Sequence, residues 1–141
     1  EVKAQHAVSL TYQRLIYRSE KIFSLDWGAS ATYFQSREGK SNVFAFSIFP
    51  VLRFYLLRKR KFDFYTNYSI IGPAFISKSD IDGFKTGPKI TYQDTMGFGV
   101  FFGKKRSYNA ELRIMHYSNG NNFPQNAGVA VPIQFTFGKT F

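Results

Sequence analysis

Residues 62–70 read Phe-Asp-Phe-Tyr-Thr-Asn-Tyr-Ser-Ile, and this alternation decides the fold class. Successive side chains of a β-strand point to opposite faces, so a period of two predicts a strand with two unlike faces. One face carries Phe62, Phe64, Tyr68 and Ile70, and the other carries Asp63, Tyr65, Asn67 and Ser69. The segment is therefore predicted to be a strand with an aromatic face and a smaller, polar face.

The same period recurs along the whole chain. It predicts seven strands, at residues 7–17, 22–35, 43–57, 62–77, 91–104, 108–119 and 128–141. Most of them exceed the usual length of a soluble strand, which is about five or six residues. All are long enough to cross a bilayer, which takes about 9–11 tilted residues.

Composition excludes several classes of protein. A length of 141 residues favours one domain, 1–141, and the absence of cysteine excludes disulfides and cysteine-based metal sites. An aromatic content of 19% is too high for a disordered chain. No apolar run reaches the roughly 18 residues of a membrane helix. A soluble β-domain, a nucleic-acid-binding fold and a membrane β-barrel remain.

The connections between the predicted strands alternate in length. Short links at 18–21, 58–61 and 104–107 alternate with longer ones at 36–42, 78–90 and about 120–127. Short periplasmic turns and longer extracellular loops are typical of outer-membrane barrels, in which the apolar face meets lipid. Phe141, which follows alternating aromatic residues, resembles the C-terminal signal of bacterial outer-membrane proteins. We therefore predict an all-β, antiparallel, up-and-down transmembrane β-barrel in the outer membrane of a Gram-negative bacterium.

The strand count has a consequence for topology. Single-chain bacterial barrels have an even number of strands and both termini in the periplasm. Seven strands place Glu1 on the extracellular side, so we expect an eight-stranded barrel whose ascending first strand is missing from this sequence, or a different structure for residues 1–6. The interior of such a barrel is filled by side chains, which makes a diffusion pore improbable.

A possible nucleophile lies near the end of the sixth predicted strand. Alternation places Glu111 and Arg113 inside the barrel, and it places His116 and Ser118 on the lipid-facing surface. A His beside a Ser is the minimal activated nucleophile, because the imidazole accepts the hydroxyl proton as the Ser attacks a carbonyl. The alternative is an inert pair in the interfacial belt. Because this strand ascends, the pair is expected in the outer leaflet, within reach of lipopolysaccharide esters.

Several runs resemble the lipid A 3-O-deacylase (PagL-type) family of outer-membrane enzymes. They are His116-Tyr117-Ser118-Asn119, Gln-Asn-Ala-Gly-Val at 125–129, Phe-Ser-Ile-Phe-Pro-Val at 46–51 and Asp-Thr-Met-Gly-Phe-Gly at 94–99. The resemblance implies an eight-stranded barrel with a Ser-His-Glu triad on its outer surface, whose first strand is absent here. It implies Ser118 as nucleophile, His116 as general base and Asn119 as a contributor to the oxyanion hole. Lipid A is the implied substrate, with no metal or diffusible cofactor.

One position departs from the family pattern. The acid of the family falls at Ala130, which hairpin geometry places opposite His116. Three explanations remain open: a Ser-His dyad, a substitute acid, or an inactive chain. Asp94 is the best substitute, because it is expected outward and across from residues 116–118. The alternative is that Asp94 lies above the hydrocarbon and is simply solvated. Glu111 is a weaker candidate for the substitute acid because it points inward.

The remaining charged features are assigned to the membrane surfaces. The basic runs at 58–61 and 104–106 occupy tight turns without a recognition helix, so they are interpreted as solvated turns near anionic headgroups and not as a nucleic-acid site. Lys78, Lys85 and Lys89 in the longest loop are candidate contacts for lipid A phosphates. A structural or adhesive small barrel and a soluble lipid-binding β-barrel are the alternative readings.

Overall fold

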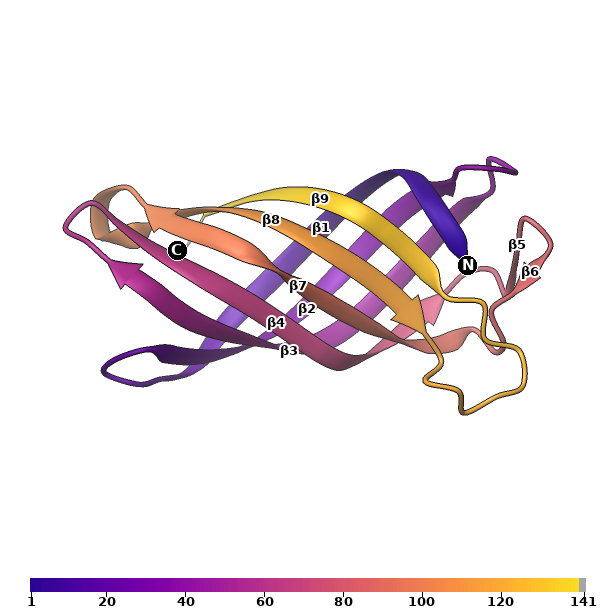
Figure 1. Ribbon diagram of the computed structural model, residues 1–141, viewed down its shortest axis with the longest axis horizontal. Helices are drawn as coiled ribbons and strands as arrows, with labels where there is room; N and C mark the ends of the chain where they lie inside the picture. Colours follow the sequence, from indigo (N-terminus) through magenta and orange to yellow (C-terminus); the bar gives the residue numbers. More distant parts are fainter. Residues whose placement is uncertain (140–141) are drawn as a thin grey trace.

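The computed structural model describes residues 1–139, and in this range it forms a closed β-barrel (Figure 1). The barrel strands, in spatial order, are β1 (Val2–Arg18), β2 (Phe23–Ser36), β3 (Asn42–Arg58), β4 (Phe62–Ile76), β7 (Ile90–Phe102), β8 (Tyr108–Ser118) and β9 (Val129–Lys139). The loop between β4 and β7 holds a small hairpin, β5 (Asp80–Ile81) and β6 (Phe84–Lys85). A 3-10 turn, η1 (Lys104–Arg106), joins β7 to β8. Among the described residues, no helix is long and apolar enough to cross a membrane.

All seven predicted strands are present. The largest difference is at the start, where β1 begins at Val2 and not at residue 7, because Ala4 and His6 continue the pairing with β2 across a register irregularity. Residues 1–6 therefore do fold differently from the prediction. Phe141, the proposed C-terminal signal, lies outside the described residues. The prediction of an up-and-down antiparallel barrel is confirmed for every consecutive pair of barrel strands.

The barrel closes through a parallel seam. With seven strands, the first and last run in the same direction, so β1 and β9 pair in parallel. Two residue pairs form this seam, Val2 with Val129 and Lys3 with Ala130, both at the end of the barrel that carries the longer loops. The N-terminus lies at this long-loop end, as the parity argument predicts (Figure 1). The described residues supply seven barrel strands, and the ascending first strand that was expected to be missing from this sequence has no counterpart among them.

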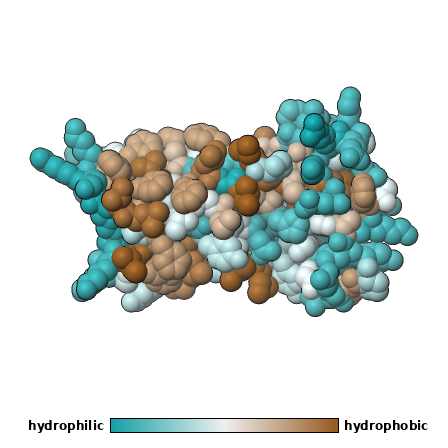
Figure 2. Space-filling view, viewed as in Figure 1, coloured by the Kyte–Doolittle hydropathy of each residue, from teal (hydrophilic) through white to brown (hydrophobic). Residues whose placement is uncertain are grey.

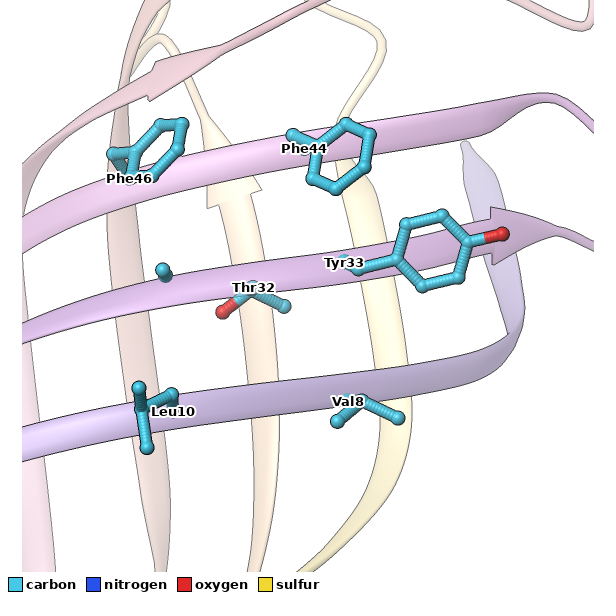
Figure 3. Close-up of a pocket in the computed structure, with 7 residues that line it drawn as sticks. Val8, Leu10, Thr32, Tyr33, Phe44 and Phe46 are labelled. Atoms are coloured by element: carbon cyan, nitrogen blue, oxygen red, sulfur yellow. The ribbon is translucent and has the colours of Figure 1, made fainter.

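The large apolar side chains of the predicted outer faces point away from the barrel. Ile133, Phe135 and Phe137 in β9 are 64–74% exposed, as are many residues of their type on the other strands. They form a broad apolar band between polar ends (Figure 2). On β1, β2 and β3 the band includes a surface groove of about 190 Å³ lined by Val8, Leu10, Tyr33, Phe44 and Phe46 among others (Figure 3). Such a surface requires lipid around it.

The interior is filled, but it is less uniformly small and polar than the sequence indicated. Near the long loops an apolar cluster includes Phe34, Tyr117 and Ile81, and the last of these enters from the β5–β6 hairpin. Towards the short turns the interior is ionic, with Arg53 paired to Asp26 and within 4.0 Å of Glu111. A barrel of this width needs large side chains to fill its centre.

Two prolines mark irregularities that position the site. The β3–β4 register is interrupted between Ser47 and Leu52, around Pro50. The β4–β7 register is interrupted between Ser69 and Gly72, next to Pro73. A proline lacks the N–H donor of the ladder, so Pro50 and Pro73 in the sequence predict a bulge or a local bend at these two places. The second bulge places Ile71 at φ 56° on the surface beside β7.

Candidate active site

Strand β8 carries His116 and Ser118 on the outer surface because its charged residues are held inside. Glu111 and Arg113 are 3% and 6% exposed, and their charged groups lie 3.6 Å apart. Glu111 also accepts a 2.8 Å hydrogen bond from the Tyr65 hydroxyl. These contacts fix which face of β8 is buried. His116 and Ser118 lie on the opposite, half-exposed face, as alternation predicted.

The two side chains neighbour each other at the long-loop end of the strand. Ser118 is the last residue of β8, and His116 precedes it by two positions on the same face. No hydrogen bond joins them among the contacts of residues 1–139. Hydrogen bonds of catalytic pairs are commonly long without substrate and tighten in the complex, so a His116-Ser118 pair without a hydrogen bond is compatible with catalysis.

Position 130 lies where the sequence placed it. In the β8–β9 ladder Ala130 is the direct partner of His116, which confirms the hairpin geometry. Its methyl group offers the imidazole no acceptor. Gly128 lies beneath the imidazole, because a Cβ built there would come 2.4 Å from His116 Nε2.

A carboxylate from the start of the chain, that of Glu1, approaches His116. Oε1 of Glu1 lies 3.5 Å from His116 Nε2, and the two side chains are 49% and 41% exposed. Glu1 reaches this point because β1 pairs with β9 at Val2 and the Val2 amide donates to the Gly128 carbonyl, at 2.8 Å. No local sequence pattern signals this contact, since the parallel seam that creates it forms only when the barrel closes.

Asp94 lies opposite His116, as predicted, but its carboxylate is engaged elsewhere. The β7–β8 ladder pairs Asp94 with His116 directly. Its Oδ1 accepts a 2.9 Å hydrogen bond from the amide of Ile71, at the β4 bulge. Within the described part of the chain Asp94 makes no ion pair with His116. It instead lines a surface pocket of about 270 Å³ that also includes Ser118, Tyr92 and Asn122.

Asn119 organises the loop that follows Ser118. Its side chain is 1% exposed, and Nδ2 donates to the carbonyls of Gln125, at 2.6 Å, and Thr86, at 3.4 Å. Its backbone amide donates to Asn126 Oδ1, at 2.9 Å. Both side-chain amide protons are thus directed at loop carbonyls, a geometry that differs from the oxyanion role implied by the resemblance.

The three lysines proposed as phosphate contacts lie in the loop that holds the β5–β6 hairpin. This loop touches the loop after Ser118, because the Ala127 amide donates to the Lys85 carbonyl at 3.0 Å. The hairpin is anchored by Asp82, whose carboxylate accepts a 2.8 Å hydrogen bond from Ser36. A backbone hydrogen bond from Gly39, reinforced by Ser36, lowers the pKa of Asp82. Lys78 and Lys89 flank this anchored hairpin near the site.

Residues 1–139 contain no cluster of three or more His, Asp or Glu side chains placed to hold a metal ion. The groups that lie together at this surface are the His-Ser pair, the carboxylates of Glu1 and Asp94, and the amides of the loop after Ser118.

Comparisons with known proteins agree with this geometry. The family model described as lipid A 3-O-deacylase (PagL) matches residues 1–132. The fold matches the crystal structure of the outer membrane enzyme PagL with a TM-score of 0.75, at 20% sequence identity, over 96% of this chain and 88% of that one. No curated protein matches the sequence. A family match over nearly the whole chain, together with the barrel and its apolar band, shows that this outer-membrane β-barrel belongs to the lipid A 3-O-deacylase (PagL) family.

Proposed function

We propose that the protein is a serine esterase that removes an ester-linked acyl chain, at the 3-position, from lipid A in the outer leaflet. The observation that carries this proposal is the His116-Ser118 pair. It faces outward at the long-loop end of a membrane barrel, in a chain of this family. A nucleophile in that place reaches a lipid ester without either partner leaving the membrane.

The reaction follows from the residues at the surface. Ser118 Oγ attacks the ester carbonyl while His116 accepts its proton, and His116 then passes this proton to the departing sugar oxygen. A water molecule then attacks the acyl-Ser118 ester while His116 accepts its proton, and His116 returns this proton to Ser118 Oγ as the fatty acid leaves. Because the Asn119 side chain is engaged with the loop, we assign the oxyanion contact to a backbone amide of the pocket that Ser118 lines, such as that of Gly120.

The third member of the catalytic group is assigned by proximity. A triad acid holds the imidazole in its productive orientation and stabilises the imidazolium. Of the described carboxylates, Glu1 alone lies within 4 Å of His116, whereas Asp94 binds the Ile71 amide. Glu1 is therefore the candidate acid, in place of the carboxylate that Ala130 does not supply.

The direct test is mass spectrometry of lipid A from cells that express the intact protein. The expected result is loss of one hydroxyacyl chain, and fragmentation of the product identifies the position that was cleaved. Ser118→Ala should abolish this loss, whereas Ser107→Ala, a matched substitution in the turn before β8, should not. Unchanged lipid A with a well-folded, abundant barrel would refute the proposal and leave a structural or adhesive barrel.

A further inference from the structure

The short-turn end of the barrel carries most of the net charge of the protein. Counting the side chains of residues 1–139 only, this end holds ten cations and two carboxylates, Glu20 and Asp63, which is +8 of the formal +10. The cations are Arg18, Lys21, Arg58, Lys59, Arg60, Lys61, Lys104, Lys105, Arg106 and Lys139. We call this set the basic collar. All of its members except Arg106 are exposed, and hydrophilic side chains project from this end, at the left of Figure 2.

Two arginines tie the separate turns of the basic collar into one surface. Arg58 donates to the Glu20 carbonyl at 3.2 Å and so joins the β3–β4 turn to the β1–β2 turn. Arg106 donates to the carbonyls of Lys59 and Arg60 and pairs with Asp63 at 3.1 Å, which joins the β7–β8 turn to the β3–β4 turn. The fold thus holds like charges together, an arrangement that costs electrostatic repulsion unless anions accompany it.

Two guanidinium groups converge at the mouth of the barrel. Those of Arg18 and Arg58 lie 5.2 and 4.2 Å from the centre of the same ring, Tyr55. Planar guanidinium groups bind phosphate oxygens in bidentate fashion, so two of them held against the same ring concentrate phosphate-binding groups at this end of the barrel.

An aromatic girdle places the basic collar at the level of lipid headgroups. Tyr17, Phe23 and Phe54 contact one another just above the turns on one side of the barrel. On the other side Phe102, Tyr108 and Phe137 form a second cluster. Aromatic girdles mark the membrane–water interface in such barrels, and basic residues immediately beyond them meet the phosphates.

We propose that the basic collar binds the phosphate headgroups of anionic phospholipids, such as phosphatidylglycerol, in the leaflet opposite to the catalytic surface. Short turns are periplasmic in outer-membrane barrels, so this leaflet is the inner, phospholipid one. The binding anchors the barrel at a fixed depth and is independent of ester hydrolysis.

Trp27, the single tryptophan, provides the probe. It is 38% exposed on the outside of β2. It lies near the start of this strand at Phe23, which is the end next to the β1–β2 turn and the basic collar. The intact protein is reconstituted in phosphatidylcholine vesicles that contain brominated phosphatidylglycerol or brominated phosphatidylcholine, and quenching of Trp27 reports which lipid lies beside it. We expect phosphatidylglycerol to be enriched about fivefold over phosphatidylcholine, and this preference should shrink in 0.5 M NaCl.

Two matched variants locate the effect. Lys21→Gln/Lys59→Gln/Lys61→Gln removes three cations of the basic collar without touching the arginine hydrogen bonds, and it should reduce the preference at least about threefold. Lys3→Gln/Arg37→Gln/Lys40→Gln removes three exposed cations at the opposite end, none of them a proposed lipid A contact, and should leave it unchanged. Migration of unheated and heated samples in gels verifies that each barrel is folded.

Three results would overturn the proposal. They are equal quenching of the wild type by both lipids, an unchanged preference in the first variant, and an equal loss in both variants. A wild type without lipid preference that co-sediments with purified peptidoglycan would assign the basic collar to an acidic cell-wall polymer instead.

Discussion

The contact between Glu1 and His116 can be tested by moving the carboxylate. Glu1→Gln removes the acid now beside the imidazole, and Ala130→Glu introduces one directly opposite His116 in the β8–β9 ladder. Directly opposed Cβ atoms in antiparallel strands lie about 4.5–5.5 Å apart, so a glutamate at 130 reaches the ring. We therefore expect Glu1→Gln to slow deacylation and Ala130→Glu to restore it in the same background.

The size of the effect follows from distance and exposure. Opposite charges 3.5 Å apart interact by about 1 kcal/mol in water and by roughly 5 kcal/mol at an effective dielectric constant of 20. Both side chains are nearly half exposed, so the water-like limit applies. A loss of about 1 kcal/mol of imidazolium stabilisation corresponds to roughly a fivefold to tenfold lower rate. This is far below the up to about 10⁴-fold cost in triads whose acid is buried.

Single-turnover deacylation of purified lipid A in detergent micelles, followed by mass spectrometry, measures this rate. Glu1→Asp should keep part of the activity, and Glu20→Gln, which removes a carboxylate at the opposite end of the barrel, should keep all of it. A wild-type rate for Glu1→Gln, together with no gain from Ala130→Glu, would show that Ser118 and His116 act as a dyad.

Three further predictions concern the surroundings of the site. Gly128→Ala should lower activity by at least about tenfold without unfolding the barrel, because the new methyl group occupies the position of the imidazole; activity and heat-modifiable gel migration measured together check this. Asp94→Asn should reduce activity by less than about tenfold, because its main contact is to the Ile71 amide; complete loss in the same assay would instead make Asp94 the acid. The pKa of Asp82 is lowered, so its carboxylate stabilises the hairpin anchor at every pH above the ordinary pKa of 3.8 and loses this effect only as the pH falls through the depressed pKa. In the wild type, proteolysis of the 78–90 loop should therefore accelerate only in strong acid. In Asp82→Asn it should be fast at every pH.

The faces of the strands and the pairing within hairpins were predictable from sequence. Alternation at 62–70 assigns each residue a side, because the pleat has a period of exactly two residues and Asp63 and Asn67 cannot face lipid. Hairpin arithmetic predicted that Ala130 lies opposite His116 and that Asp94 lies across from residues 116–118, because consecutive antiparallel strands joined by one connection have a constrained register. The outward His116-Ser118 pair follows from these two facts alone.

Other parts of the site depended on contacts between distant segments. Ile81 fills the barrel near its long loops and Asn119 binds the Thr86 carbonyl, and neither contact has a periodic signal, since loops have no fixed repeat. The bulge that gives the Ile71 amide to Asp94 lies next to Pro73, whose missing donor predicts a bulge or a bend but not which amide it exposes.

The sequence by itself thus determined a lipid-facing barrel with the His116-Ser118 pair, the proposed base and nucleophile, on its outer surface, because both features depend on the two-residue period of a strand. Which carboxylate approaches His116 was decided only by the tertiary structure. Glu1 and His116 lie at opposite ends of the chain, and only closure of the barrel through the parallel β1–β9 seam brings their side chains to 3.5 Å.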